Sequence, residues 1–212
     1  KLDKEAFFKA YYSDDLLFEP GTGFAYGDGF DVLAAIIEVV SGKPFESLMS
    51  ERIFEPLNMG DTGFWHAGRN IRKMAVNYRD NLDSRAESLY EMPLNGSCAL
   101  YSTVDDLYKW QRALMENRLL PRKYQDEMLR VQVDFGRPYG YGFDLSEVDF
   151  CGRKRKLVWH EGGNSALLSW VTEDDLLVIL LNNVGGENVR VGREIMDILY
   201  GCSAEEAGSS DE

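Results

Sequence analysis

The chain has 212 residues, of which 44% are hydrophobic and 28% are charged, so it can bury a substantial core. Its 36 acidic and 23 basic residues give a formal net charge of −13, which argues against a nucleic-acid partner. Apolar runs such as 176–181 are far too short to span a bilayer, and three widely spaced cysteines without a Cys-x-x-Cys pair indicate no zinc or redox motif. We therefore expect no nucleic-acid partner, no membrane span, no metal and no cofactor.

The first part of the chain predicts helices separated by turns. Residues 3–12 have a modest helical pattern, which a Pro-Gly turn ends. The next helix begins near Asp28 or Asp31, either of which suits the N-cap position. Its apolar residues recur at helical spacing and predict one buried stripe: Val32, Leu33, Ile36, Ile37 and Val40. Gly42 ends this helix, and Pro44 opens another.

Two further helices are expected after a long irregular connection over residues 58–95. The first starts at 102–105 (Ser-Thr-Val-Asp), a capping box in which an acidic residue replaces Glu or Gln. Its inner side carries four apolar residues: Leu107, Trp110, Leu114 and Met115. Residues 123–131 predict the second, shorter helix.

The last third of the chain has the composition of strands and turns. Four segments predict strands: residues 139–148, 155–160, 166–171 and 176–181. The first two are joined near Cys151-Gly152, where the basic run 153–156 predicts a solvated hairpin turn. The last two are joined by 172–175 (Thr-Glu-Asp-Asp), which has good turn chemistry.

A last helix is expected after Gly185-Gly186, and an acidic tail over residues 203–212 is expected to be disordered. Four apolar residues of that helix are predicted to face inward: Val191, Ile195, Ile198 and Leu199. Helices in the middle of the chain and strands at its end favour an α+β fold with an antiparallel sheet over a parallel βαβ sheet.

The segment 157–164 (Leu-Val-Trp-His-Glu-Gly-Gly-Asn) is an apolar run that stops at a histidine and two glycines. We expect it to end a strand at an edge of the sheet, because glycines there let another molecule approach the backbone. The alternative is a tight turn that contains an ordinary structural histidine.

Three segments together carry a resemblance to a known family. They are residues 19–59, with Glu-Pro-Gly, Tyr-Gly-Asp and Glu-Pro-Leu-Asn-Met, residues 97–107 (Ser-Cys-Ala-Leu-Tyr-Ser-Thr-Val-Asp-Asp-Leu), and residues 159–164. In this order and spacing they resemble the superfamily of serine β-lactamases, penicillin-binding proteins and β-lactamase-like esterases. The likeness is greatest to the branch of class C β-lactamases and D-alanyl-D-alanine carboxypeptidases, and it covers about residues 15–200.

The resemblance implies an antiparallel sheet flanked by helices, plus a helical subdomain. It implies one domain over residues 1–202, with a mainly helical part at about 15–137 and the sheet with the C-terminal helix at about 138–201. The activity it implies is acyl transfer through a serine nucleophile on a small acyl or peptide substrate.

The resemblance also assigns roles to residues of this chain. Tyr26 matches the family's tyrosine, which assists proton transfer with a lysine. His160, which begins the third motif, is assigned to the catalytic residues together with Tyr26, and the backbone N–H of Gly163 supplies one oxyanion donor. Four further residues are assigned to substrate binding: Asp28, Glu161, Gly162 and Asn164.

Two departures from the family pattern bear on activity. No serine of the chain is followed three positions later by a lysine, so the Ser-x-x-Lys nucleophile motif is absent. Because that motif precedes the tyrosine by many tens of residues in the family, we expect the fold to be N-terminally incomplete and the isolated chain to be inactive. Asp28 stands at the family's asparagine position and exchanges an amide for a carboxylate that can only accept hydrogen bonds.

Each residue also has a simpler interpretation. Tyr26 alone suits a packed aromatic, His160 a structural strand-end histidine, and Asp28 a helix cap. For the whole chain, the alternative is a non-catalytic binding or scaffold protein that retains the fold. The partners that the sequence suggests are the missing N-terminal segment, in the same or a separate chain, or a second copy. The substrate and the compartment stay open.

Overall fold

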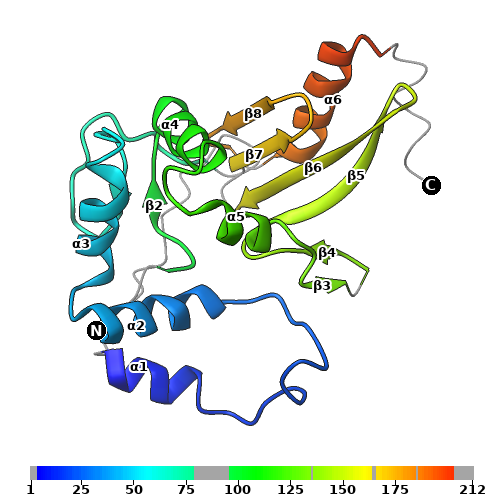
Figure 1. Ribbon diagram of the computed structural model, residues 1–212. Coiled ribbons are helices and arrows are strands. Elements are labelled where there is room, and N and C mark those ends of the chain that lie inside the picture. The colour runs from blue at the N-terminus through cyan, green and yellow to red at the C-terminus, as the bar shows by residue number, and fades with distance from the viewer. Residues whose placement is uncertain (1–3, 79–95, 135, 164–165, 185, 203–212) are drawn as a thin grey trace. The chain divides into compact units, whose positions relative to one another are not determined.

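The computed structural model describes residues 4–78, 96–134, 136–163, 166–184 and 186–202 (Figure 1). Asn164 and the expected tail over residues 203–212 lie outside these ranges. The chain divides into two compact units. The first contains Lys1–Arg72 and Leu89–Ala113, and the second contains Lys73–Ser88 and Leu114–Glu212.

The first unit is mainly helical. Its elements are α1 (Lys4–Tyr11), α2 (Gly29–Ser41), α3 (Phe45–Met49), the π-helical turn η1 (Ser50–Phe54), the short antiparallel strands β1 (Gly63–Phe64) and β2 (Leu100–Tyr101), and most of α4 (Val104–Met115). Helix α2 ends at Gly42, whose φ of 68° is left-handed and whose N–H donates to the carbonyl of Glu38 at 2.8 Å. The helices predicted at 3–12, after Asp28 and after Pro44 are therefore confirmed.

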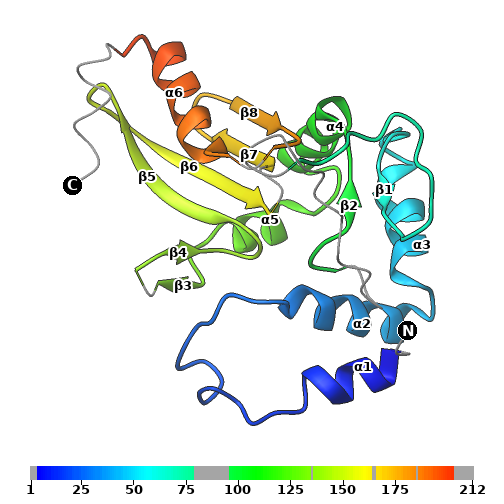
Figure 2. The same cartoon turned by 180° about the vertical axis from the view of Figure 1, so that it is seen from behind.

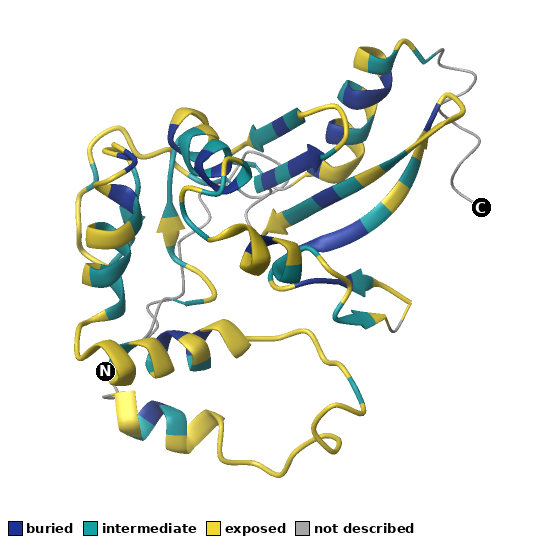
Figure 3. Cartoon of the chain, viewed as in Figure 1, coloured by how far each residue is buried: buried dark blue, intermediate teal, exposed yellow. Residues whose placement is uncertain are grey.

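The predicted buried stripe of α2 is wrong within this structure. Asp31 and Ala34 are its buried residues, whereas Leu33, Ile36, Ile37 and Val40 are all exposed (Figure 3). The stripe was inferred from apolar spacing alone. The side of α2 that is buried instead carries Asp31, because its carboxylate accepts hydrogen bonds from the N–H groups of Gly96 and Ser97.

Helix α4 begins one residue later than the predicted capping box. The hydroxyl of Thr103 accepts a hydrogen bond from the N–H of Asp106 at 3.2 Å, so Thr103 is the cap. The carboxylate of Asp106 is turned to other donors, the N–H of Asp61 and the hydroxyl of Thr62, both at 2.9 Å. This buried carboxylate thereby ties the start of α4 to the segment before β1.

The second unit is built on a six-stranded antiparallel sheet of order β3-β4-β5-β6-β7-β8. Its strands are β3 (Val133–Asp134), β4 (Pro138–Tyr139), β5 (Asp144–Phe150), β6 (Arg153–Gly162), β7 (Ala166–Val171) and β8 (Leu176–Leu181). The predicted hairpin of 166–171 and 176–181 is confirmed. The basic run 153–156 begins β6, so its assignment to the turn is wrong. Lys154 pairs with Glu147 on β5, and Arg155 pairs with Asp174 in the β7–β8 turn.

Two helices complete the second unit: α5 (Arg122–Met128) and α6 (Asn188–Tyr200). Figure 2 shows α6 lying along one face of the sheet, where it covers a buried cluster of Phe150, Val171, Val178 and Met196. Of the residues predicted to face inward, Ile195 packs against this cluster, but Ile198 and Leu199 are exposed. The inward face is centred on Gly192 and Met196, whose four-residue spacing the apolar pattern did not reveal.

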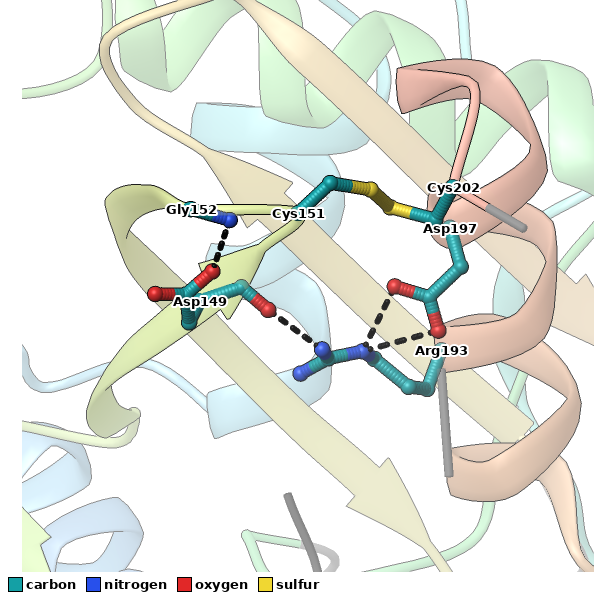
Figure 4. The surroundings of a disulfide bond; sticks show 6 residues. All are labelled: Asp149, Cys151, Gly152, Arg193, Asp197 and Cys202. Atoms are coloured by element: carbon teal, nitrogen blue, oxygen red, sulfur yellow. Dashed lines mark hydrogen bonds and ion pairs between the residues drawn. A yellow bond between two sulfur atoms is a disulfide. The ribbon is translucent and has the colours of Figure 1, made fainter. Parts of the chain in front are cut away.

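A disulfide joins Cys151, in the β5–β6 turn, to Cys202, just after α6, across a Cα–Cα distance of 5.5 Å (Figure 4). Arg193 lies beside it and joins the same two elements, since it pairs with Asp197 at 3.0 Å and donates to the carbonyl of Asp149 at 2.5 Å. The wide spacing of the cysteines in the sequence did not predict this pairing. It fixes the end of α6 to the turn at one end of the sheet.

Helices in the middle and an antiparallel sheet at the end confirm the α+β class. Within the described ranges, every helix is too short or too polar to traverse a bilayer.

Candidate active site

Among the residues that the structure describes, the C-terminal end of β6 is paired with a strand on one side only. Strand β6 lies between β5 and β7, so the predicted edge strand is wrong for most of its length. Its pairing with β5 stops at Trp159, opposite Asp144, whereas its pairing with β7 continues from His160 to Gly162. Because successive residues of a strand direct their N–H and C=O groups to opposite sides, at least one of these last three residues directs them away from β7. The sheet therefore has a local edge at His160–Gly162.

The ring of His160 is held at this edge by two contacts. Its Nε2 lies 3.1 Å from the hydroxyl of Tyr139, and its Nδ1 lies 2.7 Å from the carbonyl oxygen of Glu161. The side chain is half-buried. Tyr139 was not among the predicted site residues, and the two neighbouring Tyr-Gly pairs at 139–142 were the available hint in the sequence.

Strand alternation separates the predicted residues of the third motif. Trp159 and Glu161 share a face with Leu157, which packs against the cluster under α6. His160 and Gly162 belong to the opposite face. Alternation along the strand therefore assigns the side chains of Glu161 and His160 to opposite faces of β6.

The two glycines after Glu161 differ in what surrounds them. A Cβ at Gly162 would lie 3.2 Å from the Cβ of Ala166, whereas a Cβ at Gly163 would meet no described atom within 4 Å. The backbone φ of Gly163 is also not positive. Neither packing nor backbone conformation within the described residues therefore requires a glycine at 163, which leaves room for a ligand or another chain to approach its N–H.

An ion pair connects the turn directly before β4, the strand that contains Tyr139, to strand β5. The guanidinium of Arg137 donates through Nε and Nη2 to the carboxylate of Asp144, which is only 1% exposed. The hydrogen bond that Arg137 donates to Asp144, opposed by burial, raises the pKa of Arg137. The same guanidinium lies 5.7 Å from the ring centroid of Trp159. Arg137 thus links the β3–β4 turn to the start of β5 and to the end of β6.

Tyr26 and Asp28 lie in the first unit, directly before α2. The side chain of Tyr26 is 63% exposed. Asp28 occupies the N-cap position, and its carbonyl accepts the N–H of Asp31 at 2.9 Å, but its side chain makes no capping hydrogen bond. The carboxylate of Asp28 is exposed, so the simpler interpretation of Asp28 as a side-chain cap has no support.

The acid that anchors this segment is Asp31, which the sequence suggested only as a possible cap. It is fully buried, and its Oδ1 accepts the N–H of Gly96 at 2.8 Å and of Ser97 at 3.1 Å. Burial, followed by the charges of Asp31 and Asp28, raises the pKa of the nearby Cys98 thiol. The first turn of α2 and the segment at 96–98 are held together by these hydrogen bonds.

Comparison with known proteins identifies the family. A family model described as Beta-lactamase matches residues 1–201. The chain belongs to the Beta-lactamase family. The resemblance inferred from the three motif segments is therefore confirmed.

Known relatives of this Beta-lactamase family chain include hydrolases of more than one kind. It is 27% identical to a D-aminopeptidase of Gluconobacter oxydans (strain 621H), over 79% of this chain and 33% of that protein. It is 28% identical to the esterase EstB of Burkholderia gladioli, over 84% of this chain and 54% of that protein. The chain thus spans about a third to a half of the length of the curated relatives it matches.

The fold is shared with solved structures. The crystal structure of a penicillin-binding protein from Bacillus halodurans superposes with a TM-score of 0.78 at 25% identity, and the match covers 92% of this chain and 62% of that one. The predicted fold of this Beta-lactamase family chain, an antiparallel sheet with flanking helices, is therefore confirmed.

Proposed function

We propose that this chain carries part of the site of a serine hydrolase that transfers the acyl group of a small ester or peptide, and that the nucleophile is supplied from outside these 212 residues. The observation that carries the proposal is the local edge of β6 at His160–Gly162, followed by Gly163, in a chain of the Beta-lactamase family. Such an edge offers backbone donors to a carbonyl group that is becoming an oxyanion.

The proposed chemistry follows from the groups present. A serine hydroxyl from the nucleophile segment attacks the acyl carbonyl, and its proton passes through the hydroxyl of Tyr26 to the lysine amine of that segment. The N–H of Gly163 donates to the oxygen that gains negative charge. Donors of this kind contribute about 3–4 kcal/mol to transition-state stabilisation in comparable sites. The leaving group takes up the proton, and water then cleaves the acyl-serine ester. Asp28, Glu161, Gly162 and Asn164 are proposed to contact the substrate.

The exposed face of α2 supports the view that further polypeptide completes the unit. Leu33, Ile36 and Ile37 are 50%, 51% and 38% exposed, and Val40 is 80% exposed. An apolar face this exposed is ordinarily covered by another segment or chain. Because α2 begins directly after Tyr26 and Asp28, we propose that the polypeptide that carries the nucleophile covers this face.

The test is covalent labelling by a penicillin and by an activated ester, followed by mass spectrometry of the intact protein. The 212-residue chain is expected to stay unmodified, whereas a longer product of the same gene that encodes a Ser-x-x-Lys segment is expected to gain one acyl group on that serine. In the longer product, Tyr26→Phe is expected to slow acylation at least a hundredfold. A stoichiometric adduct on the isolated chain would overturn the proposal.

A second candidate is a binding protein that retains the fold without the chemistry. The exposed carboxylate of Asp28 at the family's asparagine position favours it, because a carboxylate cannot donate to an acyl oxygen. Saturable binding of a D-amino-acid peptide by the longer gene product, with no acylation and no turnover, would support this alternative.

A further inference from the structure

Tyr139 closes one side of the His160 ring. It ends β4 and is only 6% exposed, and its ring meets the imidazole edge-on at 6.2 Å between centroids and an interplanar angle of 66°. The phenol oxygen lies 3.1 Å from Nε2. A buried tyrosine hydroxyl ordinarily has a hydrogen-bond partner, and the imidazole supplies one here.

The partner of the other ring nitrogen decides the direction of both hydrogen bonds. A backbone carbonyl can only accept, so Nδ1, at 2.7 Å from the carbonyl of Glu161, must carry a proton. In a neutral imidazole Nε2 then holds the lone pair, and the hydroxyl of Tyr139 must donate to it. Both nitrogens of His160 are therefore engaged within the protein.

We infer that Tyr139 is a positioning residue, which holds His160 as the Nδ1–H tautomer and thereby fixes the open end of β6. The bond from Nδ1 ties the ring to the carbonyl of Glu161, one residue before the glycines. Tyr139 is itself held because it pairs with Asp144 in the sheet, and Asp144 is paired with Arg137. In this arrangement His160 orients the strand end and does not take a proton from substrate.

The inference rests on the proposed function only for its catalytic meaning. The hydrogen bonds themselves can be tested in the 212-residue chain without any turnover. If the chain proves to have no hydrolase partner, the tautomer result is unaffected. If the tautomer is wrong, the hydrolase proposal still stands on its own labelling test.

The experiment is ¹⁵N nuclear magnetic resonance of the chain labelled at histidine, at about pH 8.5, where an ordinary imidazole is neutral. His66, which pairs with Glu46 at 2.9 Å, gives the second set of signals and is assigned by His66→Gln. The His160 signals are expected to show a protonated Nδ1 and an unprotonated Nε2. Tyr139→Phe removes the donor to Nε2 and is expected to raise the fraction of the Nε2–H form, because the carbonyl of Glu161 alone then favours the Nδ1–H tautomer.

Tyr141→Phe is the matched control. It removes the hydroxyl of a tyrosine that lies two residues after Tyr139 and is 58% exposed. It is expected to leave the His160 signals unchanged. Far-ultraviolet circular dichroism of each variant shows whether the fold is retained. A wild-type His160 in the Nε2–H form, or a folded Tyr139→Phe variant with unchanged His160 signals, would overturn the inference.

Discussion

Asp31 accepts a hydrogen bond from the backbone N–H of Gly96 at 2.8 Å, across a sequence separation of 65 residues. A Cβ at Gly96 would lie 2.2 Å from the carbonyl oxygen of Phe30, so the two segments approach as closely as a glycine allows. The buried acid therefore joins the first turn of α2 to the segment that leads into β2.

Asp31→Ala is expected to lower the free energy of unfolding by about 2 kcal/mol, because it leaves two backbone N–H groups without their acceptor. Asp31→Asn retains an acceptor oxygen and is expected to lose less. Urea denaturation followed by tryptophan fluorescence measures both. An Asp31→Ala variant as stable as the exposed control Asp15→Ala would contradict the anchoring role.

Reduction of the Cys151–Cys202 disulfide is expected to destabilise the second unit. The bond closes a loop over a sequence separation of 51 residues, for which the chain-entropy argument gives about 4 kcal/mol as an upper figure. The hydrogen bond from Arg193 in α6 to the carbonyl of Asp149 in β5 does not depend on the disulfide and is expected to limit the loss of structure after reduction. Thermal unfolding with and without a reductant measures the effect, and Cys98→Ser should respond to the reductant as wild type does. Equal melting temperatures in the two conditions would count against the bond.

Arg137→Ala is expected to destabilise the protein by about 2 kcal/mol, because it leaves the buried carboxylate of Asp144 without its ion-pair partner. We expect a loss of stability at the lower end of the range for a buried ion pair, because the arginine side chain is 49% exposed and water screens the pair. Arg122→Ala, which breaks the exposed pair with Asp126, is the matched control and should change stability by less than about 0.5 kcal/mol. Equal losses in the two variants, measured by urea denaturation, would sink this assignment.

The lowered pKa of Asp106 predicts that the stability of the protein depends on pH. Burial opposes its ionisation, but hydrogen bonds from Lys109, the N–H of Asp61 and Thr62 outweigh burial and lower its pKa. Since the folded-state pKa lies below that of the unfolded chain, the stabilisation is complete above about pH 4 and is lost as the pH falls through the folded value.

The difference in unfolding free energy between wild type and Asp106→Asn should therefore be largest at pH 7 and should shrink below pH 4. Urea denaturation at a series of pH values measures it. Asp105→Asn, at the exposed neighbouring position, should keep the slope of the wild type. A wild-type advantage over Asp106→Asn that is constant with pH would refute the assignment.

The apolar face of α2 predicts self-association of the isolated chain when nothing else covers it. Ile36→Glu combined with Val40→Lys is expected to reduce binding of the hydrophobic dye ANS and to shift the sedimentation profile towards monomer. Tyr124→Lys, on the exposed side of α5, is the control and should leave both unchanged. A wild-type monomer with no dye binding would show that this face is not available, and a dimer that survives the double substitution would place the interface elsewhere.

Local patterns were sufficient for several elements. Strands β7 and β8 were predicted to the residue, because two apolar runs enclose a four-residue turn and all the information lies within that hairpin. The end of α2 at Gly42 was predictable for the same reason, since glycine alone adopts the left-handed cap without strain. Membership of the family followed from three short motifs in order.

What the sequence by itself determined was the kind of each segment and the family, because hydrophobic period, caps and turn residues act over a few neighbours. Tertiary structure alone decided which face of α2 and α6 is buried, that β6 is an interior strand with an open end, and that Cys151 meets Cys202. It also decided that Tyr139 meets His160 and that Asp31 meets Gly96. Each of these relations joins residues distant in sequence or depends on which neighbour covers a face. A short window of sequence does not predict these contacts, because their free energy depends on the whole arrangement of the chain.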